Sequence, residues 1–383
     1  MVLEKGTVRA IERIGVLLLF ILSAFLFYTQ IYWSHTDIPI HNLFLVGMIE
    51  GEVEVRPHLL YYLLLGSITF FTTDLSLVHW ASMLLLAFLV VLQFYVFRFY
   101  FEKELKLGHS PREHLYLLVL AFVALVIFNY PPGITGNFKL GQIPPNVWHN
   151  STGIFLVPFA VLLFDHSKKL LFDPGGRRGS NEWALLVLFL LNVLIKPVFA
   201  LPFLGAWAIF SLWQGKAIKS SMRDFFLVLP GVLVLLLQYF YFFESSSSGH
   251  GIAIAPFQAW NIHSDHFLLS FLVSVPFPLA FFLLKFDLVR KARDVWYGLT
   301  LFGFGMLLYI LLIEVDRPEF QNFNKCAVHT NIIFHLVCIA RFFEAFFRKK
   351  GWELRDLVLL FLLLGQVLSG LVYIGKLPFY GFI

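Results

Sequence analysis

The segment SHTDIPIHNLFLVGMIEGEVEVRPH, residues 34–58, is the first polar stretch of the chain and lies between two apolar runs. It holds one aspartate, three histidines, one arginine and three glutamates. The apolar run before it, from Ile14 to Trp33, has about twenty residues, which is long enough to cross a membrane. We therefore expect residues 34–58 to form an outer loop of a membrane protein and to build its functional site.

The composition also indicates a membrane protein. Of the 383 residues, 59% are hydrophobic and only 14% are charged, whereas soluble domains are about one quarter charged. Lipid must then be the solvent for much of the surface. The net charge of +5 is explained by Lys/Arg-rich inner loops, and this argues against a nucleic-acid partner. The expected fold is an all-α polytopic membrane protein in the plasma membrane.

The distribution of Lys and Arg predicts the topology, because cytoplasmic loops carry the excess of positive charge. The basic N-terminus is placed inside, and its apolar run is too long for the core of a signal peptide, about 7–15 residues. The chain is expected to be one integral membrane domain, residues 1–383, without a large soluble domain. The run from Leu59 to Phe71 is too short to cross and is expected to lie as a helix at the outer interface. About eleven spans are predicted, at 14–33, 75–101, 114–130, 151–164, 182–195, 198–213, 225–243, 267–284, 295–313, 326–347 and 357–374.

The predicted outer loops, 34–58, 131–150, 244–266 and 314–325, also collect most of the histidines. Sorting spans by Lys and Arg gives no reason for histidine to gather on one side, so this concentration points to chemistry there. The histidines on or next to the outer side are His35, His41, His58, His149, His250, His263, His266 and His329.

Asp37 and His41 are the catalytic candidates. They are four residues apart, so they share a face if the segment is helical. A carboxylate there can act as a general base for a sugar hydroxyl or can hold a divalent metal. Arg56 and His58 close the same loop and are candidates for substrate binding. The alternative is a solvated loop aspartate beside an interfacial histidine.

The stretch GQIPPNVWHNST, residues 141–152, places an aromatic ring beside amides and an imidazole. Such a combination suits the face of a sugar and its hydroxyl groups. The alternative is a proline-rich turn in which Asn150 or Ser151 caps the next helix. The candidates for substrate binding here are Asn146, Trp148, His149 and Asn150.

Four later residues are further candidates. Lys196, before Pro197, is either a point charge for a lipid phosphate or a snorkelling lysine at a helix end. Glu314 and Arg317 lie in EVDRPEFQNFNKCAVH; the arginine fork matches phosphate oxygens, and the alternative is a surface ion-pair cluster. His263 belongs to a short His-x-Asp-His pattern that could also hold a metal.

Together these motifs resemble the GT-C superfamily of membrane glycosyltransferases and the related polysaccharide polymerases. The resemblance is carried by Asp37 in the first outer loop, by Arg56-Pro57-His58-Leu59-Leu60-Tyr61-Tyr62, by Lys196-Pro197 and by PNVWHNST, residues 145–152. The sequence departs from the family in lacking a paired-acid DxD motif in this loop. It also lacks the large soluble C-terminal domain of oligosaccharyltransferases, so protein glycosylation is not inferred.

The resemblance implies a sugar donor linked to polyprenyl phosphate or diphosphate, and a glycan or glycolipid acceptor at the outer leaflet. Asp37 would deprotonate the acceptor hydroxyl, and Lys196 and Arg317 would hold the donor phosphate. No cofactor is implied, and a divalent metal is left open. Two alternatives remain: a transporter or flippase of lipid-linked or other polar substrates, which would carry polar groups within its spans, and a non-catalytic membrane scaffold.

Overall fold

The computed structural model describes residues 5–34, 36–130, 143–173, 179–213, 218–241, 251–262, 264–315, 322–348 and 351–379. The described chain is mostly helical, with one two-stranded antiparallel sheet, which confirms the all-α class. It divides into two compact units. The first unit comprises residues 1–126, 147–158 and 370–383, and the second comprises residues 127–146 and 159–369.

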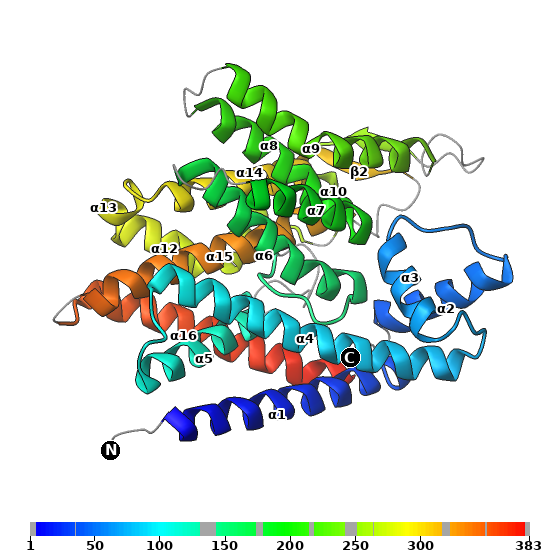
Figure 1. Ribbon diagram of the computed structural model, residues 1–383, viewed down its shortest axis with the longest axis horizontal. Coiled ribbons are helices and arrows are strands. Elements are labelled where there is room, and N and C mark those ends of the chain that lie inside the picture. Colours follow the sequence, from blue (N-terminus) through cyan, green and yellow to red (C-terminus); the bar gives the residue numbers. More distant parts are fainter. Residues whose placement is uncertain are drawn as a thin grey trace. The chain divides into compact units, whose positions relative to one another are not determined.

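The first unit is built on two long helices, α1 (Lys5–Tyr32) and α4 (Leu75–Leu105), which lie side by side (Figure 1). Glu12 pairs with Arg98, and Tyr32 lies edge-on to the ring of His79 at a centroid distance of 5.6 Å. The two helices are therefore antiparallel. About twenty residues separate these contacts along α1, which corresponds to about 30 Å at 1.5 Å per residue, the thickness of a bilayer's hydrocarbon core.

The two ends of this helix pair differ in chemistry. Arg98 and Glu12 mark a charged end. At the other end Tyr28 contacts Trp80, Trp33 and Tyr32 with ring centroids 5.9, 5.9 and 4.8 Å apart. Aromatic clusters of this kind are typical of the membrane–water interface. The pair thus has the order charge, apolar length and aromatic belt that a membrane span requires.

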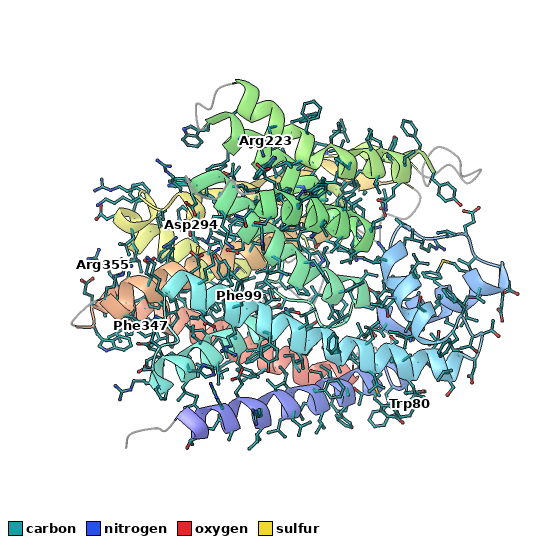
Figure 2. All side chains as sticks on the ribbon, viewed as in Figure 1. Trp80, Phe99, Arg223, Asp294, Phe347 and Arg355 are labelled. Carbon is teal, nitrogen blue, oxygen red and sulfur yellow. The ribbon has the colours of Figure 1, made fainter. Side chains whose placement is uncertain are left out.

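The outward faces of these helices are apolar. On α1, Leu22 is 63% exposed and recurs at helical spacing with other large aliphatic residues. On α4, Trp80 and Phe99 are 47% and 50% exposed, and both are labelled in Figure 2. A soluble protein rarely leaves such continuous apolar stripes open. Lipid contact explains them, and the integral membrane assignment is supported. The exposed stripe of α1 comprises Ile11, Ile14, Leu17, Leu18, Ile21, Leu22 and Phe25.

Most of the segment 34–58, which is predicted to be an outer loop between spans, is helix α2 (Asp37–Glu50), so Asp37 and His41 share a helical face. α2 ends at Gly51, whose φ of 77° is left-handed and favours glycine. Helix α3 (Leu59–Ile68) follows, and its ten residues rise only about 15 Å, too little to cross a membrane. Helices α2 and α3 lie together beside α4 (Figure 1).

Local signals explain where α4 and the neighbouring elements begin and end. The Asp74 carboxylate accepts hydrogen bonds from Ser76 N and Leu77 N at 2.9 and 3.4 Å, which caps α4. α4 ends at Lys106, which is left-handed with φ 54°. The unit is completed by α5 (Pro111–Val126), the first turns of α6 (Ser151–Phe172), the end of α16 (Leu354–Lys376) and a 3₁₀ turn, Leu377–Phe379.

The second unit holds two helix groups. α7 (Gly179–Ile195), α8 (Pro197–Trp213) and α9 (Ile218–Tyr239) pack together, and α14 (Arg293–Leu311) packs along α15 (Asn322–Arg348) and α8. Strand β1 (Ile252–Ile254) pairs antiparallel with β2 (Leu312–Glu314). The second unit also holds the larger parts of α6 and α16 and the short helices α10 (Gln258–Asn261), α11 (Phe267–Ser274), α12 (Pro276–Leu284) and α13 (Phe286–Val289).

Within the described residues five helices are long and apolar enough to cross a membrane, namely α1, α4, α14, α15 and α16. Helices α11 and α12 pass the same test together but are bent by 76°, so they are a broken span or a re-entrant loop and bring the number to six. The multi-pass character is therefore supported. The figure of eleven spans stays a prediction, because α7, α8 and the apolar part of α9 are shorter than a full crossing.

A close helix contact in the second unit gives a test of stability. A Cβ added at Gly305 in α14 would meet Thr330 Oγ1 at 2.3 Å and the Cys326 carbonyl oxygen at 2.7 Å, whereas one added at Gly303 would meet nothing within 4 Å. Gly305→Ala should lower stability by about 1–3 kcal/mol through overpacking. Gly303→Ala should leave it unchanged or slightly improved. Thermal unfolding of the detergent-solubilised protein measures both, and equal melting temperatures would contradict this packing.

The topology can be tested with single cysteines, since the native Cys326 and Cys338 are both buried. Glu52 and Arg112 are exposed and lie near opposite ends of the α1–α4 pair. Because Lys and Arg favour the inner side, Glu52→Cys should react with an impermeant maleimide added outside. Arg112→Cys should react only after the membrane is opened. The reverse pattern would invert the orientation.

Candidate functional site

Asp37 opens helix α2, where the helix dipole stabilises a negative charge. Its Oδ2 accepts a hydrogen bond from Asn150 Nδ2 at 2.7 Å. The other amide atom, Asn150 Oδ1, accepts from Gly153 N at 2.7 Å and from Thr152 Oγ1 at 3.0 Å, which caps α6. The alternative of Asn150 as a helix cap is thus confirmed, and the geometry of the cap aims its amide nitrogen at Asp37. Substrate binding by Asn150 stays a prediction.

His41 lies one turn beyond Asp37 and is buried. Its Nδ1 is 2.5 Å from the Tyr62 hydroxyl oxygen of α3. Burial first, and then neighbouring Tyr61, raise the pKa of Tyr62 far above its ordinary value, while Arg56 lowers it. Tyr62 therefore keeps its proton, and its hydroxyl shares a hydrogen bond with His41 Nδ1.

Arg56 and His58 lie beside this pair. The centre of the Arg56 guanidinium is 4.5 Å from the centroid of the Phe44 ring, a cation–π contact. The rings of His41 and His58 are 5.8 Å apart. Arg56 and His58 are half-buried, whereas His41 is more enclosed. The structure thus brings together the four candidates of the 34–58 segment on α2 and the turn before α3.

The stretch that contains Asn150 is tied to the same unit by two side chains. Gln30 of α1 donates from Nε2 to the Trp148 carbonyl oxygen at 3.0 Å. The Tyr373 hydroxyl oxygen lies 3.2 Å from Trp148 N and 2.7 Å from His149 Nδ1. These contacts fix the backbone that positions Asn150.

Trp148 and Asn146 are buried, whereas a sugar-binding surface would need their side chains exposed. The Trp148 indole is buried, donates from Nε1 to the Leu125 carbonyl oxygen at 3.3 Å and stacks with Phe27. Asn146 belongs to the second unit, where its Nδ2 donates to the Ile127 carbonyl oxygen at 3.2 Å. Both side chains thus make packing and hydrogen-bond contacts inside the protein.

Lys196 lies in the second unit at the break between α7 and α8 and is fully buried. It is within electrostatic range of Cys326 and His329, and Lys325 also acts on His329. A buried ammonium group is costly unless it is compensated, so this position is not that of a lysine reaching to the membrane surface. Burial thus argues against the alternative of a snorkelling lysine, and phosphate binding by Lys196 stays a prediction.

Glu314 ends strand β2 in the same unit. Its Oε1 accepts from Asn322 Nδ2 at 2.8 Å, and Asn322 Oδ1 lies 3.4 Å from Lys325 Nζ. Glu314 and Lys196 both act electrostatically on Cys326. The structure thus places Glu314, Lys196 and Lys325 around the start of α15, where charges of both signs gather. Arg317 and His263 lie outside the described residues.

The residues that the structure describes contain no metal-binding cluster. No group of three or more His, Cys, Asp or Glu side chains there is arranged to hold an ion. The described part of the pattern around Asp265 and His266 shows no such arrangement. Binding of a divalent metal by Asp37 stays a hypothesis from the sequence.

Three site-forming residues were missed in the sequence: Tyr62, Tyr373 and Gln30. Tyr62 stands in the aromatic LLYYLLL run, and its hydroxyl could have been matched with the histidines of the preceding segment. Tyr373 and Gln30 lie in long apolar helices. The only signal for them is that a buried tyrosine hydroxyl or amide must find a hydrogen-bond partner. Asn42 is fully buried beside His41, and neither of its side-chain amide atoms has a hydrogen-bond partner among the described residues.

The comparisons with known proteins do not assign this site. No protein-family model matches the chain. None of the curated proteins matches the sequence either.

The double role of Asn150 can be separated by substitution. Asn150→Ser keeps an oxygen for the α6 cap but removes the donor to Asp37, so stability should change by less than the ~1 kcal/mol of a lost cap. Asn150→Asp keeps the cap but sets two carboxylates together, which raises the pKa of one of them. Its melting temperature should be lower than wild type at pH 7 and should recover as the pH approaches about 4. A deficit that does not depend on pH would contradict the Asp37–Asn150 contact.

Proposed function

We propose that the protein is a membrane glycosyltransferase of the GT-C type. It would take a sugar from a polyprenyl-phosphate or -diphosphate donor at the outer leaflet and pass it to a sugar or glycolipid acceptor, in one transfer or in polymerisation. The proposal includes about eleven spans and a GT-C-like arrangement of the helices. It rests on the sequence motifs together with the side chains gathered around Asp37.

One observation carries the proposal: the Asp37 carboxylate is held by Asn150 at 2.7 Å at the aromatic end of the α1–α4 pair. A carboxylate that is oriented by a neighbouring amide and placed at a membrane interface suits a general base for a hydroxyl substrate. The charged end of the pair, with Arg98 and Glu12, lies about 30 Å away along the helix. Lys and Arg favour the cytoplasmic side, so the Asp37 end is assigned to the outside.

The reaction is an inverting displacement. The acceptor hydroxyl loses its proton to Asp37, its oxygen forms the new bond to the anomeric carbon, and the bond from that carbon to the donor phosphate breaks. The polyprenyl phosphate or diphosphate leaves with the electron pair. Arg56, which lies over the Phe44 ring and acts electrostatically on Tyr62, is proposed to bind an anionic oxygen through its planar guanidinium. His58 and His41, whose rings are 5.8 Å apart, are the further hydrogen-bonding groups proposed for hydroxyl groups of the substrate.

Lys196 and Glu314 enter the proposal as a second binding region. An ammonium group and an anion attract each other strongly where little water screens their charges. Lys325 adds a further positive charge at the start of α15. A lipid phosphate or diphosphate is such an anion.

Transport or flipping of a lipid-linked substrate is the second candidate, and the broken pair α11–α12 favours it. At this break Ser274 Oγ accepts from Ile143 N at 2.9 Å, and Asn331 Nδ2 donates to the Ile143 carbonyl oxygen at 2.6 Å. Interrupted helices with exposed backbone groups form substrate sites in many transporters. A transporter would move a lipid-linked sugar between leaflets without forming a glycosidic bond.

Asp37→Asn tests the proposed base. Asparagine keeps the shape and can still accept from Asn150, but it cannot take a proton, so turnover should fall by about 10²–10⁴-fold. Glu52→Gln, an exposed neutralisation in the same segment, is the matched control and should keep activity. The assay is transfer from a polyprenyl-linked sugar pool in membranes, followed by mass analysis of the acceptor.

Arg56→Gln should give a different phenotype. It removes a cation proposed to face the phosphate, so donor binding should weaken and become less sensitive to salt. Full activity in Asp37→Asn would remove Asp37 as the base. If the wild type forms no glycosidic bond but moves the lipid between leaflets, the protein is a transporter.

A further inference from the structure

A cavity of about 320 Å³ lies at the charged end of the α1–α4 pair. Its walls come from the first turns of α1, the C-terminal half of α4, the turn between α4 and α5, and the start of α5. All of these elements belong to the first unit. The cavity is therefore separate from the Asp37 site, which lies at the aromatic end of the same helices.

Basic side chains outnumber acidic ones in the lining. Two arginines, Arg9 and Arg98, and two histidines, His109 and His114, face one carboxylate, that of Glu12. The two Glu12 oxygens are already engaged: Oε1 pairs with Arg98, and Oε2 lies 2.9 Å from His114 Nε2. Arg98 is shared with a second carboxylate, that of Glu102, whose Oε2 lies 3.8 Å from Arg98 Nη2. Arg9 is therefore the cationic side chain of the lining that would meet an anion.

The turn that forms one wall is fixed by its own capping contacts. The Glu113 carboxylate accepts hydrogen bonds from Gly108 N, His109 N and Ser110 N at 3.1, 2.9 and 3.3 Å. The bond from His109, followed by those from Gly108 and Ser110, holds the pKa of Glu113 below its ordinary value. The turn amides are therefore already satisfied, and an anion in the cavity would be recognised by side chains, above all those of Arg9 and His109.

The surroundings favour a lipid as the source of that anion. Ile11 on α1 and Phe99 on α4 adjoin lining residues, and they are 44% and 50% exposed (Figure 2 labels Phe99). They begin the apolar stripes that run along both helices away from the charged end. A phosphate in the cavity would thus be continuous with acyl chains on these stripes, at the height where the two spans leave the membrane.

We infer that this cavity binds the phosphate headgroup of an anionic phospholipid, in the leaflet opposite the Asp37 site. The shared chemistry is a phosphate ester held by Arg9 and His109, with Arg98 behind them. This inference does not rest on the proposed glycosyl transfer, because it concerns the other end of the first unit.

The test uses the full-length protein extracted from vesicles of phosphatidylglycerol and phosphatidylcholine, with retained lipids counted by native mass spectrometry. Arg9→Gln should reduce retention of phosphatidylglycerol about fivefold, the effect expected for one basic residue near an anionic headgroup. His109→Gln should reduce it as well. Arg13→Gln is the matched control, since Arg13 is an exposed arginine one turn further along α1 that does not line the cavity. It should retain the lipid like wild type.

Three results would overturn the inference. Equal losses in Arg9→Gln and Arg13→Gln would mean unspecific surface charge. Equal retention of phosphatidylglycerol and phosphatidylcholine by the wild type would mean that no anionic headgroup is selected. If glycerol 3-phosphate or inorganic phosphate stabilises the protein in an Arg9-dependent way while phosphatidylglycerol is not retained, the cavity serves a soluble phosphate. Melting temperatures of the three variants, expected to equal that of wild type, confirm that each is folded.

Discussion

The antiparallel pairing of α1 with α4 constrains the rest of the first unit. One contact, between Glu12 and Arg98, holds the charged end. The other, between Tyr32 and His79, holds the aromatic end. Their separation of about 30 Å matches a bilayer core, so the same pair of helices sets both the membrane boundaries and the distance between two polar regions.

The Asp37 region shows how a fold element and a reactive group can depend on one side chain. Asn150 caps α6 with its amide oxygen and reaches Asp37 with its amide nitrogen. The position of α6 therefore determines the orientation of the carboxylate. The His41–Tyr62 contact at 2.5 Å does the same for α2 and α3. Each polar contact joins two elements, so the site is held by the packing of the helices and not by a flexible loop.

The sequence predicted the features that depend on composition and local order. Apolar runs predicted the helices. The short run of residues 59–71 predicted a helix too short to cross a membrane, and α3 has ten residues. The four-residue spacing of Asp37 and His41 predicted that both lie on one helical face, and both lie on α2. Within the predicted outer loop 34–58, the polar ends flank an apolar middle, NLFLVGMI, which packs as part of helix α2.

Contacts between distant parts of the chain could not be predicted in this way. The bond from Asn150 to Asp37 joins residues 113 positions apart, and that from Tyr373 to His149 joins residues 224 positions apart. No local pattern encodes such pairs. Lys196 shows the same limit, since a lysine before a proline fits a helix end at the membrane surface as well as a buried break between two helices. Only the packing of α8 against α15 decides between them.

The most direct measurement is a cryo-electron microscopy structure of the protein with a polyprenyl-phosphate sugar bound. We expect density for the sugar beside Asp37, with an acceptor-facing hydroxyl site within about 2.6–3.2 Å of the carboxylate and the phosphate next to a cationic side chain such as Arg56. Density for the donor at the α11–α12 break, with the Asp37 region empty, would contradict the assignment of Asp37 as the base and would favour transport.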